Sequence, residues 1–179
     1  MTDLLTVGTE APDFTLRSSP ARSQSLRDLR GKPVVLVFYP ADWSPVCGDQ
    51  LALYNELKDV WEGLNARVVG VSVDGVWCHQ AYSANRKLSF PLLSDFEPKG
   101  RVARLYGAYF EKDGVAQRAL YVIDANGIIR WNYLSPLGVN PGADGILKAL
   151  ESLTREQRGE TPAKSPAATP RTGPLEIRS

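Results

Sequence analysis

The sequence predicts an α/β protein with a mixed β-sheet and helices on both faces of that sheet. Residues 34–39 and 67–73 are apolar runs rich in β-branched side chains, which is typical of strands buried on both faces. The segment between them has helical periodicity. Residues 119–123 and 128–133 flank an Asn-Gly step, a strong hairpin signal. A strand, helix, strand unit followed by a hairpin and a closing helix gives such a sheet.

The strands at the start of the chain are expected to be short. Residues 14–16 and 25–26 flank a polar turn that contains Pro20, and each segment can form a brief strand. The first long strand begins at Val34 and is expected to end at Pro40, because proline has no N–H to donate to a neighbouring strand. The strand at 67–73 should pair with it in parallel, through a right-handed crossover.

A helix is predicted directly after the first buried strand. Ser44 is a favourable N-cap, and Pro45 suits the first helical position. Gly63 offers a stop. The apolar residues that recur at helical spacing are Val46, Leu53, Leu57, Val60 and Leu64. Cys47 therefore lies in the first turn of this helix.

Two further helices and two short elements complete the prediction. Asp74 can cap a second helix that ends before Pro91, and Asn140-Pro141 can cap and open the last helix. Residues 91–94 are expected to form a brief strand, and residues 100–106 a short helix. The predicted inner faces are Trp77, Ala81, Ala84 and Leu88 in the second helix, and Ile146, Leu147, Leu150 and Leu153 in the last.

Length and composition predict one domain without an extreme charge. The chain has 179 residues, enough to bury a core, with 21 Lys+Arg against 20 Asp+Glu. A net charge of +1 gives no overall attraction to nucleic acid or to an anionic membrane. We expect a domain at residues 1–155 and a disordered tail rich in Pro, Ala and Thr at 156–179.

The compartment expected from the sequence is the cytoplasm. The first eight residues lack the basic and apolar regions of a secretory signal, and no apolar stretch approaches the length of a membrane span. The two cysteines, Cys47 and Cys78, are too few for a secreted disulfide scaffold. Neither belongs to a CxxC or zinc-ligand cluster, and His79 is the single histidine. Reduced thiols with redox chemistry are the simpler interpretation.

The predicted place of Cys47 suits a nucleophile. The first turn of a helix supplies unpaired N–H groups and the positive end of the helix dipole, which favour a thiolate over a thiol. Free cysteines are also among the most buried residue types and often serve as small apolar filler. Position alone leaves both interpretations open.

The motif Pro40-Ala41-Asp42-Trp43-Ser44-Pro45-Val46-Cys47 resembles the Pro-x-x-x-Thr/Ser-x-x-Cys signature of peroxiredoxins. The segments 71–74, 90–95 and 118–124 also match, in family order, so the likeness covers roughly residues 4–155. The chain looks most like the alkyl hydroperoxide reductase E and bacterioferritin-comigratory (Q-type) branches. This resemblance implies a thioredoxin-like three-layer sandwich with a central mixed β-sheet and an N-terminal extension, and a thiol peroxidase activity.

The resemblance also implies a role for each matching residue. The Cys47 thiolate would attack a hydroperoxide and become a sulfenic acid. The Ser44 hydroxyl would cap the helix and donate to the peroxide, or only cap it. Pro40 would shape the pocket wall and shield the sulfur. Arg118 would pair with the thiolate and the peroxide, where the alternative is a solvated residue at a strand end. Gln50 would orient Arg118, or would be an ordinary exposed helix residue.

Cys78 has two open interpretations. Other peroxiredoxins place a resolving cysteine in the corresponding helix, which implies that Cys78 attacks the Cys47 sulfenic acid and forms an intramolecular disulfide. A bridge needs Cα atoms within about 7 Å, so one or both helix starts would have to unwind unless they already meet. The alternative is a one-cysteine enzyme reduced by an external thiol, with Cys78 as filler. We expect an ordinary packing or surface role for His79.

Two other classes of protein compete with a peroxidase. A general thiol-disulfide oxidoreductase needs a second cysteine close to the first, and Gly48-Asp49-Gln50 supplies none. A binding or chaperone-like protein would leave the joint presence of Ser44 and Arg118 unexplained. The resemblance implies hydrogen peroxide and organic hydroperoxides as substrates, thioredoxin or a low-molecular-weight thiol as reductant, and a homodimer. It implies no metal, flavin or nucleotide.

Overall fold

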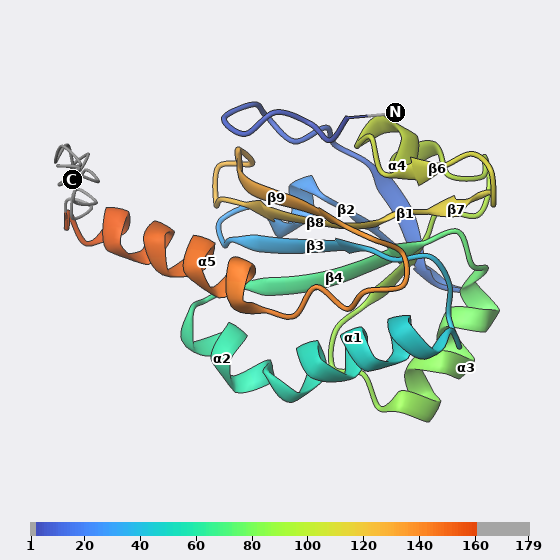
Figure 1. Ribbon diagram of the computed structural model, residues 1–179. Helices are drawn as coiled ribbons and strands as arrows, with labels where there is room; N and C mark the ends of the chain where they lie inside the picture. The colour runs from blue at the N-terminus through green and yellow to red at the C-terminus, as the bar shows by residue number, and fades with distance from the viewer. Residues whose placement is uncertain (1–2, 161–179) are drawn as a thin grey trace, which may run out of the picture.

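The structure is a computed structural model that describes residues 3–160 (Figure 1). A seven-stranded sheet runs through its centre, in the order β2-β1-β5-β4-β3-β8-β9. The pairs β3/β4 and β4/β5 are parallel and the other four are antiparallel, so the sheet is mixed as predicted. Its strands are β1 (Thr15–Ser19), β2 (Arg22–Ser25), β3 (Val34–Phe38), β4 (Arg67–Ser72), β5 (Leu92–Ser94), β8 (Arg118–Ile123) and β9 (Ile129–Ser135).

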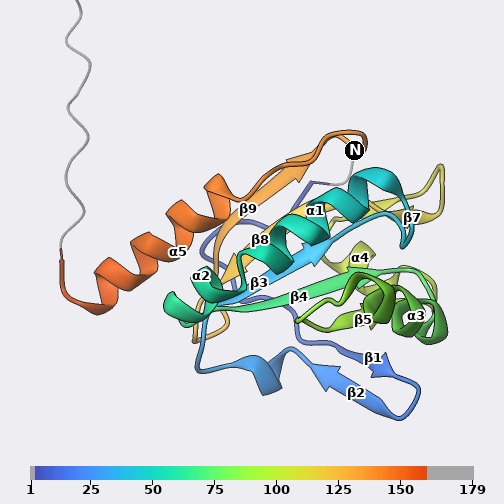
Figure 2. The same ribbon diagram turned by 90° about the horizontal axis from the view of Figure 1, so that it is seen from below.

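Helices cover both faces of this sheet and make a three-layer α/β arrangement. Figure 1 shows α1, α2 and α3 below the sheet, with α4 and the N-terminal segment above it. Seen from below, α1 and α2 lie over β3 and β4, and α5 lies beside β9 (Figure 2). The helices are α1 (Pro45–Glu56), α2 (Lys58–Gly63), α3 (Val76–Arg86), α4 (Arg101–Leu105) and α5 (Asp144–Gln157), with a 3-10 turn η1 (Arg27–Leu29).

The central strand β3 separates two hydrophobic cores. Val34, Leu36 and Phe38 belong to the core on the α4 side. Val35 and Val37 belong to the core under α1, α2 and α5, so successive side chains alternate between the faces. All five residues of β3 are buried. This confirms the prediction of a strand buried on both faces, which ends as expected before Pro40.

The predicted helix at 45–63 is broken at Leu57 into α1 and α2. The break brings Trp61 onto the core, where its indole N–H donates to the Tyr54 carbonyl at 2.7 Å. Val60, which was expected on the inner face, is 41% exposed. The predicted inner face was therefore wrong at Val60, because the chain bends to bury the larger tryptophan side chain and pair its N–H. Leu64, also predicted on this face, is partly buried against the core.

The predicted inner face of the second helix is wrong for three of its four residues, whereas Leu88 is partly buried against the core. Trp77 is 70% exposed, and Ala81 and Ala84 are exposed as well. The buried side chains of α3 are His79 and Tyr82. A search for apolar spacing does not detect a buried histidine, because histidine is polar. His79 can be buried here because polar partners inside the protein bind its ring.

Two helix starts differ from the prediction. The N-cap of α3 is Gly75 rather than Asp74, and no side-chain cap bond forms there. The last helix begins at Asp144, because Asn140 Oδ1 accepts the Gly142 N–H at 3.0 Å and forms a local turn instead of a cap.

The rest of the C-terminal prediction is tested only in part. The apolar face of α5 is confirmed, since Ile146, Leu150 and Leu153 are buried and Leu147 is partly buried. The helix extends to Gln157, two residues beyond the expected domain end at 155. The tail from residue 161 lies outside the described residues, and its disorder stays a prediction.

A hairpin and the N-terminal segment complete the fold. A small antiparallel hairpin that the sequence did not indicate joins β6 (Tyr109–Phe110) to β7 (Val115–Ala116). The segment before β1 lies beside β9, with the Gly8 N–H donating to the Ile129 carbonyl at 2.7 Å.

In residues 3–160, no helix combines the length and the apolar character needed to cross a membrane.

Candidate active site

Cys47 lies in the first turn of α1, at the carboxyl end of β3, and its side chain is fully buried. Trp43 precedes the helix with a φ of 64°, a left-handed conformation that is uncommon for a bulky side chain. This residue turns the chain from β3 into α1, and the Gly48 N–H then donates to the Ser44 carbonyl at 2.8 Å. The local backbone thus points the first helical turn back toward the end of the sheet.

Arg118 is the first residue of β8, which pairs antiparallel with β3. Ala119 lies opposite Phe38, so Arg118 starts its strand beside the point where β3 ends. Its side chain is only 1% exposed. Both terminal nitrogens, Nη1 and Nη2, lie 3.5 Å from Cys47 Sγ. Arg118 is therefore a buried cation in contact with the sulfur.

The other contacts of Arg118 are to neutral groups. Its Nε and Nη2 donate to the Leu137 carbonyl at 3.0 and 2.7 Å. Within residues 3–160, no carboxylate lies within ion-pair distance of this guanidinium. A buried charge is costly unless an opposite charge is near. Cys47 is the ionisable side chain in contact with Arg118.

Gln50 lies one helical turn after Cys47 and is fully buried rather than exposed. Its Oε1 accepts from Arg118 Nη1 at 2.7 Å, and its Nε2 donates to the Tyr54 hydroxyl at 3.2 Å. That hydroxyl donates in turn to the Gly142 carbonyl at 2.9 Å. The chain of hydrogen bonds therefore fixes the guanidinium from α1 and from the segment before α5.

Ser44 occupies the N-cap position of α1, but its hydroxyl makes no capping hydrogen bond. The expected capping role is therefore wrong for the side chain, although the backbone has an N-cap conformation, with φ −64° and ψ 136°. Ser44 and Pro40 are both partly buried in the loop between β3 and α1. The Ser44 hydroxyl thus remains available as a donor to another group.

A buried polar cluster that the sequence did not predict lies beside this loop. Asp42 Oδ2 is 2.7 Å from His79 Nδ1, and Asp42 Oδ1 accepts from the Tyr39 hydroxyl at 2.7 Å. His79 Nε2 is 3.1 Å from the Leu93 carbonyl of β5. The Asp42 N–H donates to Asp74 at 2.9 Å. His79 is therefore neither a surface residue nor an apolar filler, and it links α3 to the active-site loop.

One sequence signal could have located part of this cluster. Asp42 and Asp74 each follow the carboxyl end of a buried strand, and β3 and β4 are parallel. Carboxyl ends of parallel strands meet at the same edge of a sheet, so the two residues had to come close. Nothing in the local sequence indicated that His79 would turn toward them.

Cys78 is partly buried next to the same two carboxylates. Its Sγ and one carboxylate oxygen from each of Asp42 and Asp74 lie within 4.8 Å of one another. Burial and the negative charge of Asp42 and Asp74 raise the pKa of Cys78 to about 11. We assign no metal to this group, because Ser72, Tyr39 and His79 already engage three of its four carboxylate oxygens.

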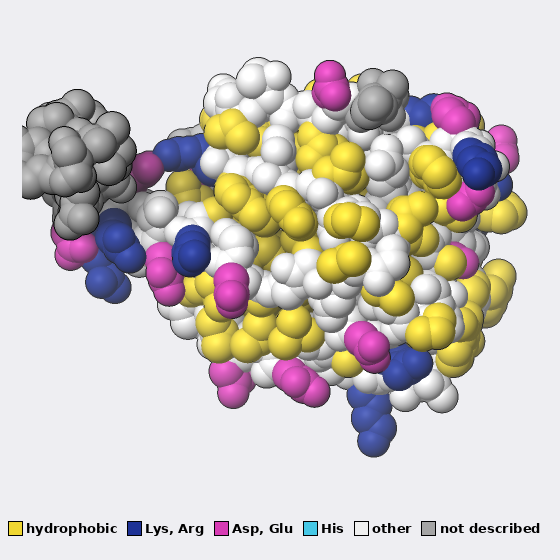
Figure 3. All heavy atoms as spheres, viewed as in Figure 1, with side chains coloured by type: hydrophobic (Ala, Val, Ile, Leu, Met, Phe, Trp, Pro, Cys, Tyr) yellow, Lys and Arg dark blue, Asp and Glu magenta, His cyan; other side chains and the backbone are white. Residues whose placement is uncertain are grey.

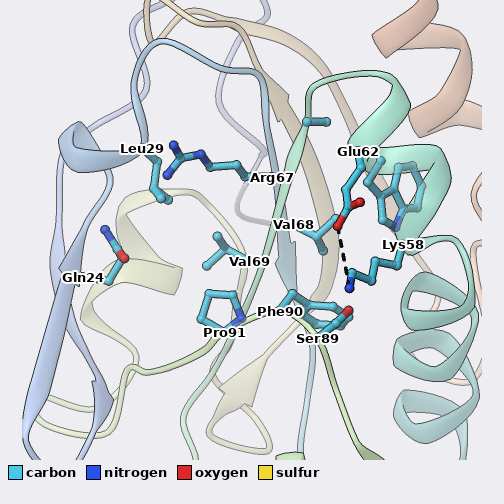
Figure 4. A pocket seen from close by; sticks show the side chains of 12 residues that line it. Gln24, Leu29, Lys58, Glu62, Arg67, Val68, Val69, Ser89, Phe90 and Pro91 are labelled. Carbon is cyan, nitrogen blue, oxygen red and sulfur yellow. Dashed lines mark ion pairs between the residues drawn. The ribbon is translucent and has the colours of Figure 1, made fainter.

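A separate cleft of about 290 Å³ lies between α2, β4 and the segment before β5 (Figure 4). Val68 and Phe90 contribute to its lining, and Lys58 and Glu62 form an ion pair of 3.8 Å beside it. Neither cysteine, Arg118 nor His79 lines this cleft. It is therefore distinct from the thiol site, and we assign it no role.

Comparisons with known proteins agree with this geometry. The family model described as the AhpC/TSA family matches residues 7–132. The alkyl hydroperoxide reductase E of Mycobacterium tuberculosis is 37% identical over 129 residues, which cover 72% of this chain and 84% of that protein. Peroxiredoxin-1 of Gallus gallus is 34% identical over 158 residues, covering 82% and 78%.

Solved structures extend the likeness to the fold. The crystal structure of Enterococcus faecalis AhpC superposes with a TM-score of 0.79 at 28% identity, and the match covers 88% of this chain and 98% of that one. The thioredoxin-like arrangement expected from the motif is thereby confirmed. With the matching family, the similar sequences and the shared fold together, this chain belongs to the AhpC/TSA family of peroxiredoxins.

Proposed function

We propose that this chain, a thiol peroxidase of the peroxiredoxin family, reduces hydrogen peroxide and organic hydroperoxides with Cys47 as the attacking thiolate. The observation that carries this proposal is the buried Arg118 guanidinium, with two nitrogens 3.5 Å from Cys47 Sγ. A fixed cation at that distance stabilises negative charge on the sulfur and on an oxygen next to it.

The first step transfers one oxygen atom. The Cys47 thiolate attacks the terminal oxygen of ROOH, the O–O bond breaks, and RO⁻ leaves and takes up a proton to become ROH. Cys47 is oxidised to a sulfenic acid and the peroxide is reduced. Negative charge moves from sulfur to the leaving oxygen, so donors placed along that path stabilise the transition state more than the ground state.

Ser44 and Pro40 complete the proposed peroxide site. The Ser44 hydroxyl, which makes no capping bond, is the proposed donor to the peroxide. Pro40 is the proposed wall that keeps water from the sulfur. Phe110, Leu134, Pro136 and Leu137 line an apolar hollow, and the Leu137 carbonyl binds Arg118. Leu137 thus belongs both to this hollow and to the contacts of Arg118, which supports the inclusion of organic hydroperoxides among the substrates.

We further propose that Cys78 resolves the sulfenic acid. The Cys78 sulfur attacks the Cys47 sulfur, an S–S bond forms, and the S–O bond breaks with release of water, which carries the Cys78 thiol proton. The partial exposure of Cys78 and its place in the first turn of α3 support this assignment. The alternative is direct reduction of Cys47 by an external thiol.

Two further proposals concern the surroundings of the enzyme. Thioredoxin or a low-molecular-weight thiol is the proposed reductant, and the cytoplasm is the proposed compartment.

A homodimer is also proposed, because the edge strand β9 exposes Tyr133 and Leu134, and hydrophobic side chains gather over it (Figure 3). Sedimentation of wild type and Leu134→Glu tests this last point: a dimer that the variant dissociates supports it, and a monomeric wild type contradicts it.

The test of the catalytic proposal uses reduced protein and one equivalent of peroxide. We expect rapid consumption by wild type and by Cys78→Ser, and none above background by Cys47→Ser. Consumption by Cys47→Ser at the wild-type rate would contradict the proposal.

Peptide mapping by mass spectrometry then decides how the sulfenic acid is removed. A linked Cys47–Cys78 peptide in wild type supports resolution by Cys78. A persistent sulfenic acid at Cys47 in wild type favours the one-cysteine alternative.

A further inference from the structure

The buried pair of His79 and Asp42 joins the two segments that carry the cysteines. His79 follows Cys78 in the first turns of α3, and Asp42 lies in the loop that leads to Cys47. The two side chains are 2% and 0% exposed, and Nδ1 and Oδ2 are 2.7 Å apart. They form a direct contact between α3 and the active-site loop that is sealed from solvent.

Several polar contacts surround this pair. Both ring nitrogens of His79 face oxygens, from Asp42 at 2.7 Å and from the Leu93 carbonyl at 3.1 Å. A short polar contact therefore joins His79 to Asp42, and a second contact joins His79 to β5. Tyr39 donates to the other oxygen of Asp42 at 2.7 Å, and the Asp42 N–H binds Asp74.

Resolution by Cys78 requires both sulfurs to leave their present partners. The side chain of Cys47 is fully buried against Arg118, whereas Cys78 faces the carboxylates of Asp42 and Asp74. A disulfide needs the two Cα atoms within about 7 Å and the Cβ atoms facing each other. Unwinding the start of α3 or of the loop before α1 separates His79 from Asp42, since one lies on each segment.

We propose that the His79–Asp42 pair is a latch that holds the start of α3 on the active-site loop and sets the rate at which Cys78 reaches the Cys47 sulfenic acid. This inference rests on the proposed resolving role of Cys78. His79 and Asp42 act here as positioning residues, because neither touches the peroxide or forms a bond to sulfur. A buried set of polar contacts is costly to open, so the latch favours the closed form.

The latch has a chemical consequence for Cys47. While the latch is closed, Cys78 does not reach the sulfenic acid of Cys47. A second peroxide can then oxidise this sulfenic acid to a sulfinic acid with release of ROH. The same carboxylates disfavour the thiolate of Cys78, and opening removes it from their field. A tight latch therefore slows resolution and increases over-oxidation of Cys47.

The test compares full-length wild type with His79→Gln and Asp42→Asn. Stopped-flow kinetics after one equivalent of peroxide give the rate of disulfide formation, and mass spectrometry after excess peroxide gives the sulfinic acid at Cys47. Amide hydrogen exchange measures the opening of residues 76–82. Gln80→Ala is the matched control, because Gln80 is the next residue on α3 and is exposed.

We expect each latch variant to form the disulfide about tenfold faster or more, to exchange its α3 amides faster, and to accumulate less sulfinic acid. The double variant should add little to either single variant, because both remove the same contact. Gln80→Ala should match wild type. Folding of each variant is checked by near-ultraviolet circular dichroism, and if His79→Gln does not fold, Asp42→Asn and Tyr39→Phe carry the test.

Two results would overturn the proposal in distinguishable ways. In the first, wild type yields the linked peptide, but the folded variants show unchanged amide exchange and an unchanged or slower rate of disulfide formation. This result would reject the latch and leave Cys78 as the resolving residue. A wild type with no Cys47–Cys78 peptide would remove the assignment of Cys78, and with it the role of the latch in setting the rate.

Discussion

At the scale of single residues, the site depends on a buried arginine that contacts no carboxylate in the described part of the chain. Arg118 spreads five N–H donors in a plane, and three of its nitrogens reach the Leu137 carbonyl, Gln50 and Cys47. A guanidinium held on several sides cannot turn away from the sulfur. It therefore offers its charge to the reacting atoms without any reorganisation.

Replacing this group by a lysine should keep the charge and lose the geometry. We expect Arg118→Lys to lower the second-order rate constant for peroxide by roughly a hundredfold, since one ammonium cannot reach all of these partners. Stopped-flow measurement of peroxide reduction checks this value. Arg22→Lys, at an exposed arginine of β2, is the control and should leave the rate unchanged. An Arg118→Lys rate within twofold of wild type would contradict the geometric argument.

Cys78 should react slowly with alkylating reagents in the reduced protein. With its pKa raised to about 11 by burial and by Asp42 and Asp74, iodoacetamide at pH 8 should modify it roughly 10- to 100-fold more slowly than a free cysteine. The rate should climb about tenfold per pH unit until pH approaches 11. Asp74→Asn should accelerate the reaction. Equal rates for Cys78 and a free thiol would contradict this prediction.

The same shift affects stability in a defined direction. The thiol pKa of Cys78 is higher in the folded than in the unfolded chain, so folding favours the protonated form. Its effect on stability is therefore flat below the ordinary thiol pKa near 9, and stability declines as the pH rises above that value.

At the scale of elements, the packing of α5 on β9 depends on a glycine. A Cβ placed on Gly145 would lie 2.5 Å from Trp131 Cζ2, closer than side-chain atoms can approach. Trp131 in turn stacks on Tyr133 at an interplanar angle of 14°. The first turn of α5 can therefore approach the strand closely only because residue 145 has no side chain.

We expect Gly145→Ala to lower the free energy of unfolding by about 1–3 kcal/mol, because the tryptophan must move away from the helix. Gly63→Ala in α2 is the matched control. No atom lies within 4 Å of its added Cβ, so it should leave stability unchanged or raise it by up to about 1 kcal/mol. Urea denaturation measures both. Equal effects of the two substitutions would contradict the steric argument.

At the scale of the whole molecule, the N-terminal segment is joined to the face of the sheet opposite α1. The Tyr121 hydroxyl accepts from the Leu5 N–H at 3.0 Å and donates to the Tyr106 carbonyl of the α4 end. Asn132 on β9 donates to the Leu5 carbonyl at 2.6 Å. One tyrosine thus connects the N-terminal segment, the sheet and α4, on the side away from Cys47.

Removing that hydroxyl should affect stability without affecting catalysis. Tyr121→Phe leaves the Leu5 N–H and the Tyr106 carbonyl without this partner, which should lower the free energy of unfolding by about 1–3 kcal/mol. Peroxide reduction should stay within twofold of wild type. Tyr133→Phe, at a tyrosine that is 44% exposed, is the control and should change stability by less than about 0.5 kcal/mol. Loss of activity in Tyr121→Phe would show that the two faces are coupled.

Much of this architecture could be predicted because its signals are local. The apolar run at β3, the Asn-Gly step before β9 and the turn that starts α1 each depend on neighbouring residues. The motif from Pro40 to Cys47 is a local signal too, because its residues are contiguous in the chain. Predictions failed where contacts with residues far away in the sequence determine which face of a helix is buried. Trp61 and His79 are buried because of Tyr54 and Asp42, and apolar spacing does not reveal such contacts.

The sequence by itself determined the mixed sheet, the helix whose first turn holds Cys47 and the family motif, because these depend on backbone propensity and short spacings. Only the tertiary structure decided that Arg118 is buried against Cys47 and that His79 joins Asp42. Both contacts link residues far apart in the chain. Their physical basis is the burial of charge and hydrogen-bonding groups, which is set by the packing of all elements together.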